Sequence, residues 1–213
     1  MPTNIVFDFG AVLFTWQPHV LVQAHFPAHA TTPVAARQLA ADIFNHDDWQ
    51  AFDGGLLELP AVSERTARRL NLPHETLHAL MTRIPEHLMP IPETLSVLSQ
   101  LNQRRERAGD VRLYFLSNMP QPYARALEQR HSFLNWFDGG VFSGDAKLIK
   151  PQPEIFQLIQ SRFDLDPANT VFIDDLIANV KAARTHGWRG IHFESAAQLE
   201  EDLKAHTLNW IGS

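Results

Sequence analysis

Short, nearly all-apolar runs recur along the second half of the chain, and one stands near its start. The runs are residues 5–7, 111–116, 140–142, 170–173 and 190–193. They scarcely alternate with polar residues, which is typical of parallel strands covered by helices on both faces. The sequence therefore predicts a buried parallel sheet.

Stretches with the spacing of amphipathic helices separate these runs. They are residues 93–102, 123–129, 153–163 and a segment that ends at 186. A final helix is expected after Ser195, with Gln198 placed as in a capping box. Strands that alternate with helices in this way predict an α/β fold with a doubly wound, Rossmann-like parallel sheet.

The stretch between the first two strands departs from this alternation. Residues 15–89 have a helical pattern throughout, and Pro90 and Pro92 end it, because proline interrupts a helix interior. Individual helices are expected at residues 35–44 and 58–70. We therefore expect a core domain of residues 1–14 and 90–213, with residues 15–89 inserted as a small helical domain.

Length and composition indicate a protein with a full hydrophobic core. The chain has 213 residues, of which 45% are hydrophobic, and this suits one α/β domain with a modest insertion. The formal charge of −6 offers no basic field for nucleic acid. No run of about 18 apolar residues could span a bilayer, and no signal-peptide pattern precedes the first strand. We expect no nucleic-acid or membrane partner and a cytoplasmic location, and the oligomeric state stays open.

Cysteine is absent, which excludes disulfides, thiolate metal sites and cysteine nucleophiles. The eleven histidines look scattered, with no His-x-x-x-His helix pair expected beside a carboxylate, so no zinc site is predicted. Any metal should have oxygen or imidazole ligands.

Polar side chains follow four of the apolar runs. They are Asp8, the pair Ser117 and Asn118, Lys150, and the pair Asp174 and Asp175. Because the carboxyl ends of parallel strands meet at one edge of a sheet, these groups are expected to converge. Carboxylates suit Mg²⁺, and an ammonium group beside hydroxyl and amide groups suits a phosphate. The sequence predicts a site for Mg²⁺ and a phosphorylated small molecule.

Each group has an ordinary structural explanation when taken alone. Asp8 could cap a turn, Ser117 could cap a helix, and Lys150 could be a solvated lysine. Two adjacent carboxylates such as Asp174 and Asp175, however, repel each other unless a cation lies between them. The occurrence of all four clusters together favours a functional site.

The same residues resemble the four ordered motifs of haloacid dehalogenase-like hydrolases. The matching segments are residues 8–13, 116–118, 150–156 and 171–175, with Asn179 beyond the last. The resemblance implies a Rossmann-like core with a small helical cap, Mg²⁺ as cofactor, and hydrolysis of a phosphate monoester through an aspartyl-phosphate. The first motif is most similar to bacterial α-D-glucose-1-phosphate phosphatases, which implies a sugar phosphate, such as an anomeric hexose phosphate, as one candidate substrate.

Chemistry and this resemblance assign the same roles to these residues. Asp8 would attack phosphorus and also bind Mg²⁺. Ser117 and Asn118 would donate hydrogen bonds to phosphate oxygens. Lys150 would place its charge between the phosphate and the carboxylates.

Three residues would complete the metal site. Asp174 and Asp175 would hold Mg²⁺, one directly and one through water, in an order that the sequence leaves open. The backbone carbonyl of Gly10 would be a further ligand, because that contact needs no side chain.

Gly10 also departs from the pattern of many phosphatases in this superfamily, which carry a second Asp there as general acid. Positioned acid catalysis is worth roughly 10²- to 10⁴-fold. Three explanations stay open: an acidic leaving group, loss of hydrolytic activity, or a proton donor from the inserted segment, such as His19, His46 or Asp47.

Two other functions also stay open. A metal-free 2-haloacid dehalogenase is compatible with Gly10 and with the pair Ser117 and Asn118, although the Asp174–Asp175 pair argues against it. A non-catalytic phosphate-binding module is the other alternative.

The inserted segment holds two further features. Its aromatic residues are interpreted as ordinary core rather than as the wall of a site: Trp16, Phe44, Trp49 and Phe52. Residues 53–55, Asp-Gly-Gly, are interpreted as a turn between helices that requires no chemistry.

Overall fold

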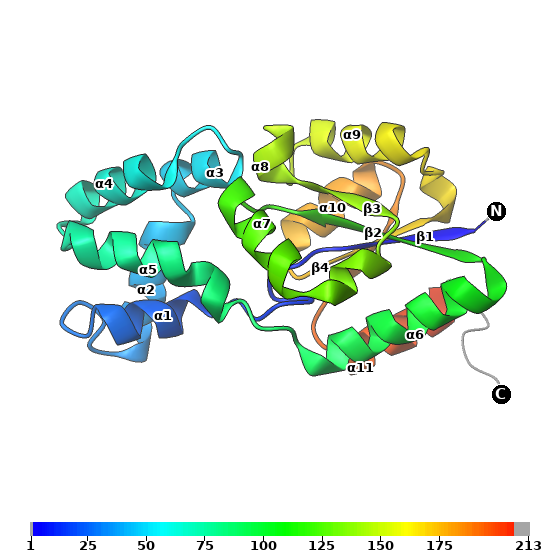
Figure 1. Cartoon of the computed structure of the whole chain (residues 1–213), viewed down its shortest axis with the longest axis horizontal. Helices are drawn as coiled ribbons and strands as arrows, with labels where there is room; N and C mark the ends of the chain where they lie inside the picture. Colours follow the sequence, from blue (N-terminus) through cyan, green and yellow to red (C-terminus); the bar gives the residue numbers. More distant parts are fainter. Residues whose placement is uncertain (1, 207–213) are drawn as a thin grey trace.

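The computed structural model describes residues 2–206 and contains a parallel sheet of five strands in the order β3-β2-β1-β4-β5. The strands are β1 (Thr3–Phe7), β2 (Val111–Ser117), β3 (Gly139–Phe142), β4 (Thr170–Asp174) and β5 (Arg189–His192). The predicted α/β fold is therefore confirmed. β1 is central, flanked by β2 and β4, so the residues that follow these three strands share one edge of the sheet (Figure 1).

Helices cover both faces of the sheet, and alternate residues of β1 supply both cores. Ile5 and Phe7 belong to the larger core, with residues of α6 (Pro92–Ala108) and α11 (Ala196–His206). Val6 belongs to the second core, with residues of α9 (Pro153–Phe163) and α10 (Ile177–Thr185). The remaining core-side helices are α7 (Gln121–Arg130), α8 (Ser143–Ala146), η1 (Ser132–Trp136) and η2 (Pro167–Asn169). Residues buried on both faces explain why the strands lack alternation.

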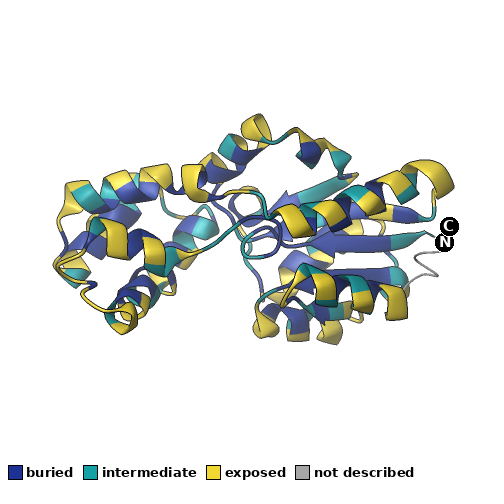
Figure 2. Ribbon diagram, turned by 90° about the horizontal axis from the view of Figure 1, so that it is seen from below, coloured by how far each residue is buried: buried dark blue, intermediate teal, exposed yellow. Residues whose placement is uncertain are grey.

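A helical insertion lies beside the carboxyl edge of the sheet (Figures 1 and 2). It consists of α1 (Pro18–His25), α2 (Pro33–Phe44), α3 (Asp47–Asp53), α4 (Leu59–Leu70) and α5 (His74–His87). Its two connections to the sheet run together, since Phe14 bridges to Pro90. The sequence pattern predicts α2 and α4 as separate helices and gives α1, α3 and α5 only as part of a helical stretch.

The insertion also touches the core domain away from these connections. Ser143 Oγ donates to the backbone oxygen of Asp53 at 2.6 Å, and Lys147 Nζ donates to that of Gly55. Arg130 donates to the backbone oxygen of Pro85 at 2.9 Å. These contacts hold the insertion against α7 and α8 and so set the width of the space between insertion and sheet.

Two smaller expectations can be compared with the structure. α6 extends to Ala108, beyond the expected end at residue 102, and stops at Gly109 in the left-handed conformation. Ser195 caps α11, because its Oγ accepts from the N–H of Gln198 at 3.2 Å. The side-chain oxygen of Gln198 accepts from the N–H of Glu194, and not from that of Ser195 as a capping box requires.

Within residues 2–206, no helix is both long enough and apolar enough to span a membrane.

Replacing Gly55 with Ala tests the contact between insertion and core. Gly55 has a φ of +63°, and a Cβ there would clash with the backbone oxygen of Gly144. Gly109 is a matched control, because its φ is +65° and a Cβ there would meet nothing within 4 Å. Gly109→Ala should cost only the left-handed strain of about 1 kcal/mol, and Gly55→Ala should cost clearly more. Urea unfolding of both variants measures this, and equal losses would contradict the close contact.

Candidate active site

Lys150 lies at the centre of a buried cluster of ion pairs. Its ammonium nitrogen is 2.9 Å from Asp8 Oδ1 and 2.6 Å from Asp174 Oδ2, and the lysine side chain is 1% exposed. Asp8 follows β1 and Asp174 ends β4, so the pairing of these adjacent strands brings both carboxylates together. The N–H of Asp8 also donates to the backbone oxygen of Ile173 at 2.9 Å.

The carboxylate of Asp174 is surrounded by donors. Oδ1 accepts from the N–H of Leu176 at 2.8 Å and from Asn179 Nδ2 at 3.0 Å. Oδ2 accepts from Lys150 Nζ and also from Asn179 Nδ2 at 3.0 Å. Each carboxylate oxygen has about two acceptor positions, so those of Asp174 are filled. Asn179, which sequence reasoning gave no role, orients this side chain.

Three carboxylates form a group of oxygens that could hold a cation. One oxygen each from Asp8, Asp174 and Asp175 lies within 4.8 Å of the others. Burial raises the pKa of Asp8 to about 7; Lys150 lowers it, and the charges of Asp174 and Asp175 raise it. Burial, with the charge of Asp174, also raises the pKa of Asp175 to about 6. A divalent cation would relieve this repulsion, so the donor set fits Mg²⁺.

The side chain of Lys150 stays protonated in the interior. Burial alone lowers the pKa of this ammonium, but the charges and hydrogen bonds of Asp174 and Asp8 outweigh burial and leave the pKa above its ordinary value. Lys150 is therefore a permanent cation at the end of the pocket.

Asn118 has a contact that the sequence did not predict. Its Nδ2 donates to the backbone oxygen of Lys150 at 3.0 Å, and its Oδ1 accepts from the backbone N–H of Lys150 at 2.8 Å. This two-way pairing ties the end of β2 to the segment that carries the lysine. One amide N–H of Asn118 is left over, and Ser117, 1% exposed, lines the same pocket.

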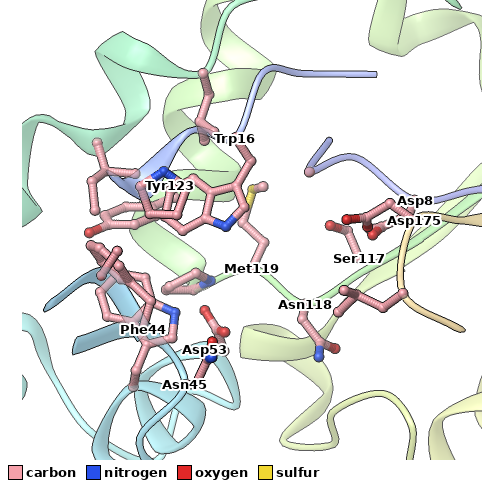
Figure 3. A pocket seen from close by; sticks show the side chains of 18 of the residues that line it. Asp8, Trp16, Phe44, Asn45, Asp53, Ser117, Asn118, Met119, Tyr123 and Asp175 are labelled. Atoms are coloured by element: carbon pink, nitrogen blue, oxygen red, sulfur yellow. The ribbon is translucent and has the colours of Figure 1, made fainter. Parts of the chain in front are cut away.

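The carboxyl edge of the sheet opens into a cavity of about 390 Å³ under the insertion (Figure 3). Trp16, Phe44 and Trp49 line it, although Phe44, Trp49 and Phe52 also belong to the hydrophobic core, as expected. Phe52 is not in the wall. The ring centroids of Phe44 and Trp49 lie 4.7 Å apart at 90°, an edge-to-face pair. The part of the cavity remote from Asp8 therefore has an aromatic wall.

Gly10 also lines this cavity, and its backbone does not require glycine. Its φ is not positive, and the nearest atom to an added Cβ would be Trp16 Cβ at 4.0 Å. Of the three proton donors considered from the sequence, His19 lines the cavity, whereas His46 and Asp47 do not. His46 instead caps α3 through the N–H of Asp48 at 3.1 Å.

Asp53 is a site residue that sequence reasoning missed. The turn predicted at residues 53–55 is present, since α3 ends at Asp53 and Gly54 follows as its cap. The side chain of Asp53 nevertheless lines the cavity and lies between the aromatic wall and the Asp8 group (Figure 3). The spacing from Trp49, four residues earlier on the same helix face, was the available signal.

The expectation that no pair of histidines stands four residues apart beside a carboxylate was wrong. His74 and His78 stand four residues apart on α5, next to Glu75. Ser63 Oγ lies 3.3 Å from His74 Nε2 and 2.9 Å from His78 Nδ1. Within the described residues, the carboxylate triad above is the cluster of potential metal ligands, and it contains neither histidine.

The family model described as "haloacid dehalogenase-like hydrolase" matches residues 5–187. The chain therefore belongs to the haloacid dehalogenase-like hydrolases, as the four motifs indicate, and the protein is an enzyme of the hydrolase class.

Relatives of known description include a sesquiterpene phosphatase, astK, of Aspergillus oryzae, which is 29% identical over 93% of this chain and 93% of its own. The drimenol cyclase drtB of Aspergillus calidoustus is 24% identical over 95% of this chain, but the match covers 36% of that protein. A phosphorylated carbohydrates phosphatase of Thermotoga maritima is 30% identical over 38% of each chain.

Solved structures share the fold. An enzyme of this family from Bacteroides thetaiotaomicron, in complex with magnesium and inorganic phosphate, gives a TM-score of 0.70 at 20% identity, covering 93% of this chain and 99% of that one. L-2-haloacid dehalogenase from Xanthobacter autotrophicus gives 0.66 at 20% identity, with coverages of 97% and 84%. An enzyme with bound magnesium and phosphate and a 2-haloacid dehalogenase share this fold, so the likeness alone does not decide the reaction of this chain.

Mg²⁺ binding should strengthen as pH rises, because a proton competes with the metal for each carboxylate. Asp8 and Asp175, with pKa values of about 7 and about 6, must ionise to bind it. Both values lie above the ordinary 3.8, so the metal-free protein should lose stability as pH rises from about 4 to about 7. Thermal unfolding with increasing Mg²⁺, at about pH 5 and about pH 8, should give the larger stabilisation at the higher pH. Equal stabilisation at both pH values would contradict ligation by these carboxylates.

Proposed function

We propose that this protein is a Mg²⁺-dependent phosphatase that hydrolyses a small phosphate monoester through an aspartyl-phosphate on Asp8. The observation that carries the proposal is the buried ammonium of Lys150, held between Asp8 and Asp174 beneath a largely apolar cavity. A dianionic phosphate needs such a fixed cation, and phosphoryl transfer depends on positioning and charge compensation. The core domain is residues 1–14 and 90–213, and residues 15–89 serve as a cap over the site.

The chain's own residues divide the work of the reaction. A carboxylate oxygen of Asp8 attacks phosphorus, the ester oxygen leaves, and water later releases phosphate from the aspartyl group. Ser117 and the remaining amide N–H of Asn118 donate to phosphate oxygens. Lys150 favours the ionised form of Asp8 and holds one of its oxygens at 2.9 Å.

The metal ligands are Asp8, Asp175 and the backbone carbonyl of Gly10. Asp175 binds directly, because its side chain lines the cavity, whereas the acceptor positions of Asp174 are filled by Lys150, Leu176 and Asn179. Asp174 contributes its charge and holds Lys150 in place. Bound Mg²⁺ supplies positive charge to the phosphoryl oxygens during transfer.

The substrate carries an apolar organic group. Trp16, Phe44 and Met119 wall the part of the cavity away from Asp8, and Trp49 lines the cavity with its ring against Phe44. Hexose hydroxyls placed against these rings would lose hydrogen bonds to water, and Asn45 and Asp53 could replace only part of them, which favours a hydrocarbon over the sugar phosphate suggested by the first motif. The similarity to a sesquiterpene phosphatase over nearly the whole chain supports the same substrate class.

The two alternatives fit less well. Carbon displacement by a 2-haloacid dehalogenase has no use for the three converging carboxylates at the end of the cavity. A binding module without catalysis has no need for a carboxylate held 2.9 Å from a buried ammonium and facing a cavity.

Asp8→Asn should abolish phosphatase activity and leave the fold intact, because the amide keeps the shape but is not a nucleophile. The assay measures phosphate release with Mg²⁺ from a prenyl-type monophosphate, an aryl phosphate and a hexose phosphate. Wild-type protein should act on the prenyl-type ester with the highest kcat/KM.

Chloride release from a 2-haloacid is measured on the same samples. Turnover by Asp8→Asn with a normal unfolding transition would remove Asp8 as nucleophile. Chloride release without phosphate release would replace the phosphatase proposal by the dehalogenase, and preference for the hexose phosphate would overturn the apolar substrate class.

Asp175→Asn and Asp174→Asn should have different effects. Asp175→Asn should raise the Mg²⁺ concentration for half-maximal activity at least about tenfold, since it removes a direct ligand. Asp174→Asn should lower stability by about 2 kcal/mol, since Lys150 loses a charged partner. Metal titrations of activity and urea unfolding of both variants separate these effects. If Asp174 rather than Asp175 binds Mg²⁺ directly, Asp174→Asn should show the higher Mg²⁺ requirement and Asp175→Asn the loss of stability.

A further inference from the structure

The cap contributes one carboxyl group to the wall of the cavity. Asp53 ends α3 and lines the cavity, lying between the aromatic wall and Asp8 in Figure 3. Asp53 and Asp8 come from opposite sides of the cavity, because one belongs to the insertion and the other follows β1. A phosphate ester bound at Asp8 would direct its ester oxygen away from the nucleophile, toward the insertion.

Contacts on both sides hold Asp53 in this position. Its backbone oxygen accepts from Ser143 Oγ at 2.6 Å, which ties the end of α3 to α8 of the core. Its carboxyl group accepts a hydrogen bond from the side chain of Trp49, whose only donor is the indole N–H. The group is therefore oriented before substrate arrives, which is what a catalytic group requires.

The remaining titratable groups of the cavity wall are less suited to protonating a leaving oxygen. Those groups within the described residues are Asp8, His19, Arg37, Tyr123, Lys150 and Asp175. Asp8, Lys150 and Asp175 belong to the nucleophile and metal site, and Arg37 does not release its proton in proteins. The hydroxyl of Tyr123 donates to the backbone oxygen of Met81. His19 is the other candidate.

The surroundings of Asp53 favour the protonated form of its carboxyl group. Burial raises its pKa well above the ordinary value; the hydrogen bond from Trp49 lowers it, the charge of Asp8 raises it, and that of Lys150 lowers it. Burial also raises the pKa of Tyr123 on α7, and an ionised Asp53 would raise it further. A carboxyl group whose protonated form is favoured in this way is suited to act as a general acid.

We propose that Asp53 is the catalytic residue that protonates the leaving oxygen, in place of the acid that Gly10 lacks. This inference rests on the proposed function. As Asp8 forms its bond to phosphorus, the bond from phosphorus to the ester oxygen breaks, and its electron pair takes the proton of Asp53. The alcohol leaves, and the Asp53 carboxylate takes a proton from the water that cleaves the aspartyl-phosphate, which restores both carboxyl groups.

The test measures kcat/KM for a series of phosphate monoesters, from nitrophenyl to simple alkyl, for wild type, Asp53→Asn and His19→Ala. Asn keeps the shape of Asp53 and can still accept from Trp49. Alkyl esters need the proton most, so Asp53→Asn should lose roughly 10²- to 10⁴-fold on them and little on the nitrophenyl ester. The wild-type rate on alkyl esters should fall as rising pH ionises Asp53, and this fall should be absent in the variant.

A double variant distinguishes a proton-donor role of Asp53 from a merely structural one. Adding Gly10→Asp to Asp53→Asn places an acid beside the nucleophile, where an added Cβ would make only an ordinary contact with Trp16 Cβ at 4.0 Å. Recovery of the alkyl-ester rates in this double variant would support the donor role. An equal loss on all esters would mean that Asp53 only positions the cap, and a selective loss in His19→Ala alone would assign the proton to His19.

The proposal and the underlying function fail in distinguishable ways. Absence of wild-type turnover on every phosphate monoester, or activity of Asp8→Asn, removes the proposed function itself. Normal wild-type turnover with an unchanged leaving-group dependence in Asp53→Asn removes only the role of Asp53. Trapping of phosphate on Asp8 in the Asp53→Asn variant, detected by mass spectrometry with the nitrophenyl ester, should show that the nucleophile still works.

Discussion

The burial of one ammonium group between two carboxylates organises this structure. Lys150 can remain charged in the interior only because Asp8 and Asp174 lie 2.9 and 2.6 Å from it. The two carboxylates are close because β1 and β4 are neighbours, and the lysine reaches them because Asn118 holds its backbone from the end of β2. Three strands therefore have to be paired correctly before this charge cluster can form.

The two sides of the cavity differ in chemistry, since one is formed by the sheet and the other by the insertion. The sheet supplies charges that are tightly paired, and the insertion supplies aromatic rings together with the polar side chains of His19, Arg37, Asn45 and Asp53. The contact of Asp53 and Gly55 with α8 fixes the distance between the two sides. Burial raises the pKa values of both Asp8 and Asp53, and it strengthens the electrostatic effects among the charged groups near Asp8.

Sequence patterns predicted the strands most accurately, because burial on both faces alone decides their composition. Strands buried on both faces have to be apolar, and each expected run is a strand of the sheet. The boundaries were less accurate, as in α6, where polar exposed turns continue the helix beyond residue 102. Within the insertion, short helices such as α3 gave no distinct signal, because seven residues hold too few apolar positions to define a period.

The order of apolar runs and the polar residues that follow them determined the fold, the family and the candidates Asp8, Ser117, Asn118, Lys150, Asp174 and Asp175. These are local properties of the chain, since each cluster directly follows an apolar run or lies within a few residues of one. Only the tertiary structure decided that Asp174 is saturated while Asp175 faces the cavity, and that Asp53 reaches the site from the insertion. Hydrogen-bond saturation and the position of a distant segment depend on contacts between residues far apart in the sequence, and no local pattern encodes them.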